Sequence, residues 1–145
     1  KGLLLYGGLD SQSLGNAGLC RRVSLAPQFH DNHVLHGTLA FNVLLGRRWP
    51  ASEQTRQLAE TVCRELGLGP LLARMPQGME QLVGETGWQL SHGERTRVFA
   101  ARAICADAKL AILDESVGAL DPHTAQAALR CALERTRSLM LIAHL

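Results

Sequence analysis

Two adjacent carboxylates, Asp114 and Glu115, directly follow the apolar run LAIL at residues 110–113. Such a run predicts a buried strand, which holds the backbone of the residues after it in a fixed position. Because successive strand side chains point in opposite directions, the two carboxylates need not share one site. One of them can hold a magnesium ion while the other positions a water molecule for attack on a phosphate. Taken alone, the pair is also compatible with a solvated acidic turn.

Two further polar side chains follow predicted strands. Gln28 comes two residues after the strand VSLA, and His144 directly follows the apolar run LMLIA. Ligands of a parallel sheet bind beyond the carboxyl ends of its strands. We therefore expect Gln28 and His144 to lie at the same edge of the sheet as the carboxylate pair.

A third group of candidate residues lies in LSHGE at residues 90–94. Ser91 and Glu94 have the S-x-x-E spacing of a capping box, which predicts that a helix begins at Ser91. The free N–H groups and positive dipole end of a helix start favour an anion, and Gly93 allows a ligand to approach the backbone closely. Capping boxes are common, so this pattern alone does not distinguish a ligand site from a helix start.

The elements that must position these residues alternate between strands and helices. Turn and cap residues separate the segments, and Thr38 is placed to cap a short helix. This alternation predicts an α/β protein with a mostly parallel sheet covered on both faces. The expected strands are 2–6, 22–26, 110–113 and 139–143, and the longer helices are about 52–66, 92–106 and 121–135.

Composition restricts the class of protein. The chain has 145 residues, 46% of them apolar, which is typical of a globular domain or part of a larger one. A net charge of +2 does not predict a nucleic-acid or membrane surface. The four cysteines are far apart in sequence, which favours small buried side chains in a reducing compartment over disulfides. No apolar run reaches the roughly 18 residues that a membrane span needs.

The motifs together resemble the nucleotide-binding domain of ATP-binding-cassette (ABC) transporters. Five motifs stand in the order and at the spacing of that family, and the resemblance covers nearly the whole chain. They are APQF (26–29) for the Q-loop, LSHGE (90–94) for the signature motif, LAILDE (110–115) for the Walker B strand, SVGALD (116–121) for the D-loop, and His144 for the switch histidine.

Two longer stretches are similar to exporters of this family, HGTLAFNVLLG at 36–46 and MPQGMEQLVGETGWQLSHGE at 75–94. The resemblance implies a partial ABC ATPase domain of the P-loop NTPase class, with a mostly parallel sheet, flanking helices and a helical subdomain. We expect the core sheet in residues 1–30 and 107–145. The helical subdomain is expected at about 31–106.

The resemblance also implies a role for each matched residue. Catalytic roles fall to Glu115, which polarises the attacking water, and to His144, which contacts the γ-phosphate. Asp114 and Gln28 are expected at the magnesium ion. The residues expected to contact nucleotide are Gln28, Ser91, Gly93, Glu94 and Asp121, with Asp121 coupling the two sites of a dimer.

Cofactors and partners follow from the same resemblance. ATP and Mg²⁺ are expected, together with a transmembrane domain, fused or separate, and a second nucleotide-binding domain in a head-to-tail dimer. The domain is expected at the cytoplasmic face of the membrane, with no nucleic-acid partner.

The sequence departs from the family pattern in several places. These residues contain no G-x-x-x-x-G-K-[S/T] loop, which cradles phosphates through backbone N–H groups and a lysine. We therefore expect the 145 residues alone to be inactive and the activity to belong to a longer parent chain. His92 and Glu94 replace the usual glycine and glutamine of the signature motif, and Gly118 replaces the usual serine of the D-loop. We expect His92 to crowd the nucleotide or to strain the backbone.

Two alternative functions stay open. One is a soluble ABC ATPase of DNA repair or translation, favoured mildly by the glutamate in LSHGE. The other is a degenerate regulatory cassette that binds nucleotide without turnover, favoured mildly by His92. The weak basic charge and the exporter-like stretches argue against the first, and the presence of Glu115 and His144 argues against the second.

Overall fold

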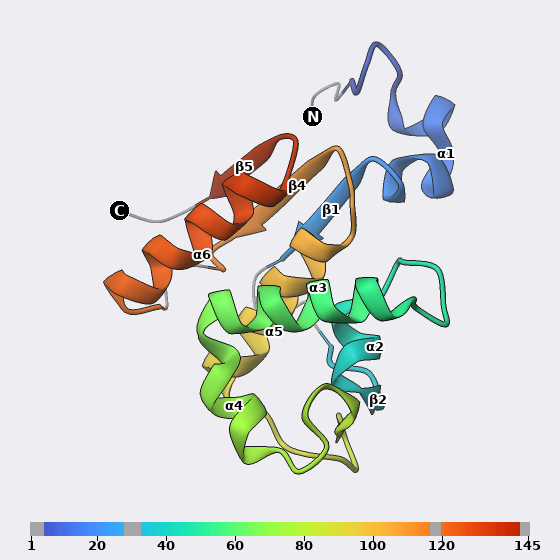
Figure 1. Ribbon diagram of the computed structural model, residues 1–145. Helices are drawn as coiled ribbons and strands as arrows, with labels where there is room; N and C mark the ends of the chain where they lie inside the picture. Colours follow the sequence, from blue (N-terminus) through green and yellow to red (C-terminus); the bar gives the residue numbers. More distant parts are fainter. Residues whose placement is uncertain (1–4, 28–32, 117–119, 143–145) are drawn as a thin grey trace.

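The structure is a computed structural model that describes residues 5–27, 33–116 and 120–142. A three-stranded parallel sheet lies at one end of the molecule, and most of the helices pack below it (Figure 1). Its strands are β1 (Val23–Ala26), β4 (Leu110–Asp114) and β5 (Leu139–Ile142), in the order β1-β4-β5.

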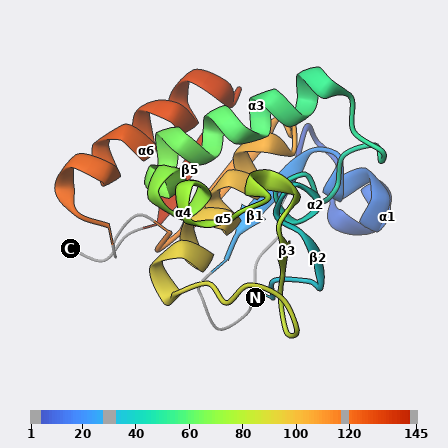
Figure 2. The same cartoon turned by 60° about the horizontal axis from the view of Figure 1, so that its bottom comes forward.

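The helices connect the strands and build a second layer. A small antiparallel sheet of β2 (Gly37–Thr38) and β3 (Leu82–Val83) lies beside the short helix α2 (Figure 2). The helical segments are α1 (Ser11–Cys20), α2 (Leu39–Val43), α3 (Glu53–Cys63), the π-helical turn η2 (Arg64–Leu68), α4 (Gly69–Arg74), the 3₁₀ turn η3 (Gly78–Glu80), α5 (His92–Cys105) and α6 (Pro122–Arg135).

Side-chain caps begin the helices where the sequence predicts them. Thr38 accepts from the Phe41 N–H at 3.0 Å at the start of α2, and Ser52 accepts from the Thr55 N–H at 3.2 Å at the start of α3. Each cap satisfies a backbone donor that has no partner within the helix. The predicted helices at about 52–66, 92–106 and 121–135 are therefore confirmed, with boundaries shifted by a few residues.

The hydrophobic core lies between the helices and one face of the sheet. Helix α5 packs against β1 and β4, and its residues Val98, Phe99 and Ala101 are buried. Strand residues that face this helix, such as Ala26 and Leu113, are buried as well. Burial of this apolar surface is the main stabilising contribution to the arrangement.

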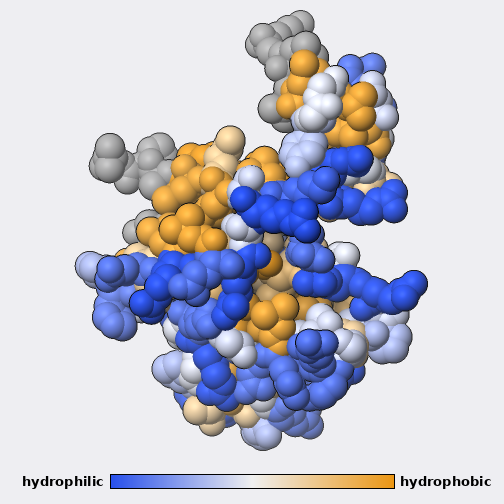
Figure 3. Space-filling model, turned by 45° about the horizontal axis from the view of Figure 1, so that its top comes forward, coloured by the Kyte–Doolittle hydropathy of each residue, from blue (hydrophilic) through white to orange (hydrophobic). Residues whose placement is uncertain are grey.

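The opposite face of the sheet is only partly covered in the described residues. Leu25 and Met140 are about half exposed, at 50% and 49%, and neighbouring residues of β5 are exposed too. Figure 3 shows the resulting apolar surface over β5. The expectation that helices cover both faces is therefore wrong for the part of the chain described here.

Two further expectations have clear outcomes. Residues 2–4 of the strand predicted at 2–6 lie outside the described residues. In the described remainder, Leu5 is not in a strand and Tyr6 forms an isolated antiparallel bridge to Leu9 across the turn at Gly7 and Gly8. The helical segment α1, which the sequence did not predict, follows it and is interrupted at Gly15. Within the described residues, no helix has the length and apolar character of a membrane span.

Three of the four cysteines are buried, as the sequence predicts, and the fourth is not. Cys63, Cys105 and Cys131 are buried and unpaired, and Cys20 is exposed and unpaired. Burial raises the pKa of the Cys105 and Cys131 thiols to about 12 and raises the pKa of Cys63 further. These thiols are therefore neutral packing groups and have little reactivity at neutral pH.

Candidate functional site

The carboxyl ends of the three strands meet at one edge of the sheet. Ala26 pairs with Leu113, and Asp114 pairs with Ile142. The Glu115 N–H then donates to the Ile142 carbonyl at 2.9 Å, so β4 and β5 stay in register up to the carboxylate pair. Strand β4 is the central strand, so the end that carries the carboxylates is held from both sides.

The predicted partners of this edge follow the two outer strands. Gln28 is two residues beyond Ala26, and His144 is two residues beyond Ile142. Both lie outside the described residues, as does Gly118. The structure therefore places the strand ends that lead to Gln28 and His144 beside Asp114, and the two side chains themselves stay predictions.

Glu115 has an unusual backbone conformation. Its φ is +52°, in the left-handed region that residues other than glycine rarely adopt. Asp114 is still part of β4, so the chain turns sharply between the two carboxylates. Both are half-buried. The alternation of strand side chains therefore does not extend to Glu115.

Ser116 ties this turn to the neighbouring strand. It is 2% exposed, and its hydroxyl lies 3.2 Å from the carbonyl oxygens of both Ala26 and Asp114. The hydroxyl therefore joins the end of β1, two residues before Gln28, to the end of β4. Sequence reasoning missed this role, because a serine after two carboxylates gives no sign that buried carbonyl groups will surround it.

The carboxylate edge fits a magnesium ion. Mg²⁺ takes one or two protein carboxylates and completes its octahedral shell with water and phosphate oxygens. Asp114, the last residue of β4, provides such a carboxylate at the end of the central strand. Among the described residues, no group of three or more histidines, cysteines, aspartates or glutamates has the arrangement of a metal site held by protein ligands alone.

The predicted capping box is present at the start of α5. The Ser91 hydroxyl accepts from the Glu94 N–H at 3.3 Å, and Glu94 Oε2 accepts from the Ser91 N–H at 2.8 Å. Reciprocal capping satisfies two free donors and fixes the first turn of the helix. The sequence thus correctly predicted where this helix begins and which side chains begin it.

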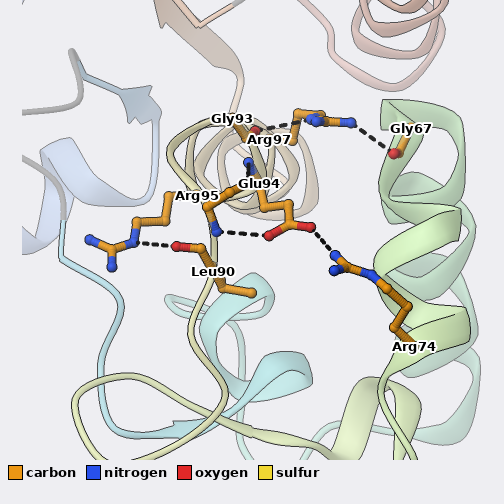
Figure 4. A network of polar contacts seen from close by, with 8 residues as sticks. Gly67, Arg74, Leu90, Gly93, Glu94, Arg95 and Arg97 are labelled. Atoms are coloured by element: carbon orange, nitrogen blue, oxygen red, sulfur yellow. Dashed lines mark hydrogen bonds and ion pairs between the residues drawn. The ribbon is translucent and has the colours of Figure 1, made fainter.

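The second oxygen of Glu94 is also occupied. Arg74, at the end of α4, donates through Nη2 to Glu94 Oε1 (Figure 4). The Glu94 side chain is only 14% exposed, whereas that of Arg74 is 59% exposed. The Glu94 carboxylate is therefore both hydrogen-bonded to the helix start and paired with a cation.

Arg97 extends the same network toward η2. Its Nε donates to the Gly93 carbonyl at 3.0 Å, and its Nη1 donates to the Gly67 carbonyl at 2.8 Å (Figure 4). Gly67 has a φ of +75°, and a Cβ added there would lie 3.0 Å from Thr124 Cγ2. Arg97 thus connects the first turn of α5 to the turn at Gly67, which packs tightly against the start of α6.

The two unusual positions at the start of α5 do not distort it. His92 is the exposed first residue of the helix, and among the described residues only Asp107 and Glu115 are non-glycine residues with positive φ. The expected backbone strain at His92 is therefore absent. A Cβ added at Gly93 would lie 3.5 Å from an Arg97 nitrogen, an ordinary contact, so packing within the chain does not require glycine there.

Asp121 begins α6. Its Oδ1 accepts from the Thr124 N–H at 3.0 Å, and the hydrogen bonds from Thr124 lower the pKa of the Asp121 carboxyl below its ordinary value. The side chain is exposed. Asp121 is thus a helix cap at the surface, with one oxygen of its carboxylate committed to that cap.

The predicted residues therefore form three groups in the described chain. Asp114 and Glu115 lie at the sheet edge, Ser91, Gly93 and Glu94 lie at the start of α5, and Asp121 lies at the start of α6. The partners that sequence reasoning did not find are Ser116, Arg74 and Arg97. Each of these residues acts through a hydrogen bond between positions 20 to 90 apart in sequence, and patterns in a single sequence do not reveal such contacts.

Comparison with known proteins gives a consistent family. The sequence pattern of the protein family described as ABC transporter matches residues 4–118 of this chain. The chain superposes on a solved structure titled as a bacterial Atm1-family ABC exporter with ATP bound, with a TM-score of 0.81 and 30% identity. That match covers 100% of this chain and 25% of the exporter. It confirms the predicted α/β fold of an ABC ATPase domain.

Curated relatives agree with that match. The ABC transporter ATM1 of Toxoplasma gondii is 35% identical over 93% of this chain, and the mitochondrial iron-sulfur clusters transporter ATM1 of Saccharomyces cerevisiae is 33% identical over 99%. The ATP-dependent lipid A-core flippase of Sodalis glossinidius is 32% identical over 99%. This chain spans only 12%, 20% and 24% of those proteins, respectively. The chain belongs to the ABC transporter family.

Proposed function

We propose that these residues are part of the ATP-binding and ATP-hydrolysing domain of a membrane exporter. The observation that carries the proposal is the register at the sheet edge, which places Asp114 and Glu115 beside the strand ends that lead to Gln28 and His144. The family match and the exporter-type relatives support the same function. A charged pair at the mouth of a parallel sheet suits phosphoryl transfer, in which the protein mainly positions groups and neutralises charge.

Within this proposal the two carboxylates have different tasks. Glu115 accepts a hydrogen bond from the attacking water and polarises it, and Asp114 together with Gln28 holds the magnesium ion. The sharp turn at φ +52° supports this division, because Asp114 ends the strand while Glu115 has a different backbone conformation. When bound, Mg²⁺ supplies positive charge to the phosphate oxygens. His144 contacts the γ-phosphate and so completes the edge.

The start of α5 takes the role of a phosphate-binding face. Ser91, Gly93 and Glu94 lie at the first turn, where the positive end of the helix dipole favours an anion. The absence of any packing requirement for glycine at Gly93 supports close approach of a ligand to the backbone there. In a head-to-tail dimer this face meets the nucleotide of a second nucleotide-binding domain, and Asp121 lies between the two sites.

The proposed partners are a transmembrane domain and that second nucleotide-binding domain, at the cytoplasmic face of a membrane. We divide the chain into a sheet part, 1–30 and 107–145, and a helical part at about 31–106. The chain covers 25% of the solved exporter, which supports a longer full-length protein. Because these residues contain no G-x-x-x-x-G-K-[S/T] loop, we further propose that the 145 residues alone do not hydrolyse ATP.

The decisive experiment replaces the proposed general base in the full-length protein that carries these residues. Glu115→Gln keeps the size of the side chain and removes its basicity, so Mg²⁺-dependent ATP turnover should fall roughly 100-fold or more. Binding of ATP should persist. Glu134→Gln, at an exposed position of α6, is the matched control and should leave turnover unchanged.

Three outcomes separate the functions. Loss of turnover with retained ATP binding supports the exporter ATPase. Equal, very slow turnover in the wild type and in Glu115→Gln, with ATP bound by both, contradicts it and favours a regulatory cassette. A wild-type protein that neither binds nor hydrolyses ATP contradicts both functions.

A further inference from the structure

The signature segment carries a carboxylate in a place where phosphate is proposed to bind, and the structure shows how its charge is compensated. Glu94 stands at the third position of α5, within the first turn. A full negative charge there favours the helix dipole but opposes an incoming phosphate. Which effect prevails depends on what else contacts the carboxylate.

Both oxygens of Glu94 have partners. Oε2 accepts from the Ser91 N–H at 2.8 Å, and Oε1 accepts from Arg74 Nη2 (Figure 4). The side chain is 14% exposed, so solvent screens its charge poorly. The guanidinium of Arg74 is therefore the group that neutralises Glu94, since the Ser91 N–H is a dipole without net charge.

Arg74 comes from a different element. It is the last residue of α4, where a cation is also favoured by the negative end of the helix dipole. The hydrogen bond joins positions 20 apart in sequence, so it depends on the packing of this helical region. Arg74 contacts Glu94 on the side away from the capping bond, which leaves the cap intact.

We propose that Arg74 is a positioning residue that makes the first turn of α5 able to accept a phosphate, by cancelling the charge of Glu94. This inference rests on the proposed function. Arg74 acts through Glu94 and is not itself a ligand of the nucleotide. The pair Arg74 and Glu94 replaces the neutral glutamine of the usual signature motif with two residues whose charges sum to zero.

The test is a double-mutant cycle on ATP turnover by the full-length protein. Arg74→Ala leaves Glu94 charged and unpaired, so KM for ATP should rise about tenfold, as one uncompensated charge near a phosphate implies. Glu94→Gln keeps an oxygen for the Ser91 N–H, removes the negative charge and leaves the Arg74 cation uncompensated, so KM should fall. The double variant Arg74→Ala with Glu94→Gln should return KM to near the wild-type value.

A matched control separates charge from packing. Arg56→Ala breaks the ion pair of Arg56 with Glu80, 2.9 Å long, which also joins two elements of the helical region and lies at partly exposed side chains. It should leave KM unchanged. Retention of labelled ATP, measured in a Glu115→Gln background, should follow the same pattern as KM and reports binding without turnover.

Each result decides the proposal. Rescue of Arg74→Ala by Glu94→Gln supports it. An unchanged KM in Arg74→Ala overturns it, and so does a raised KM that Glu94→Gln fails to rescue, because Arg74 would then serve packing alone. Failure of the proposed function is recognised separately, as a wild-type protein without ATP turnover.

Discussion

The sheet edge and the start of α5 position their functional side chains in different ways. At the sheet edge, the backbone positions the carboxylates. Strand β4 lies between two parallel neighbours, and the Glu115 N–H, in a residue with a φ of +52°, donates to the Ile142 carbonyl. At the start of α5, side chains fix the first turn. Arg74, at the end of α4, donates to Glu94, and Arg97, within α5, donates to the Gly93 carbonyl. The first arrangement is rigid because its strands are paired, and the second is only as rigid as its polar network.

This difference predicts how each region responds to substitution. A backbone-held site tolerates changes in side chains around it and loses function mainly when the reacting side chain changes. A site held by a polar network loses geometry when any member is removed, because the remaining members relax or lose partners. The substitutions below test the contrast between the two regions.

The largest effect is expected at the strained carboxylate. Glu115→Gly removes the proposed base, so turnover should fall about 100-fold or more. It also removes the cost of about 1 kcal/mol that a side chain pays in the left-handed region, so a fall in turnover reports lost chemistry and not added backbone strain. Thermal unfolding and ATP turnover of the full-length protein measure both quantities.

A second acidic residue with positive φ is the control for that prediction. Asp107 has a φ of +59°, its side chain is 76% exposed, and its ion pair with Arg47 is 3.6 Å long. Asp107→Gly should leave turnover unchanged and should not lower the melting temperature. A loss of turnover in Asp107→Gly as large as that in Glu115→Gly would contradict the role of Glu115 as the base, because both variants relieve the same kind of backbone strain.

The sequence predicted the backbone-held region better than the network-held region. Apolar runs followed by polar residues mark strand ends, so β1, β4 and β5 and the place of Asp114 and Glu115 were predictable. The capping box at Ser91 was predictable too, since both of its members lie within four residues. The charge partner Arg74 was not, because a hydrogen bond between positions 20 apart depends on how α4 packs against α5. Ser116 was missed for the same reason, since its acceptor on Ala26 lies 90 positions away.

The intermediate effect is expected in the polar network. Arg97→Ala removes two charge-assisted hydrogen bonds, to Gly93 and Gly67, so local unfolding around the start of α5 should become easier by about 2 kcal/mol. Hydrogen exchange should then be at least roughly tenfold faster in peptides covering 64–68 and 91–96. Peptides from β4 should not change.

The neighbouring arginine is the control for this change. Arg95 donates from Nε to the Leu90 carbonyl at 3.2 Å. Arg95→Ala should therefore accelerate exchange less than Arg97→Ala does, and it should leave 64–68 unaffected. Equal acceleration in both variants would show that Arg97 does not connect α5 to η2 in the way proposed.

The smallest effect is expected from two buried serines of similar burial and chemistry. Ser116 bonds to carbonyl groups at the sheet edge, and Ser24 donates to the Ala103 carbonyl at 2.8 Å, deep beneath α5. Replacing either by alanine removes one buried hydroxyl, so each should lower the free energy of unfolding by about 1 kcal/mol. Only Ser116→Ala should also reduce ATP turnover, by a few-fold, because only Ser116 joins the strand before Gln28 to the carboxylate turn. If Ser24→Ala reduces turnover as much as Ser116→Ala does, the loss of turnover follows from the lower stability of the whole domain. The hydroxyl of Ser116 would then have no special role at the sheet edge.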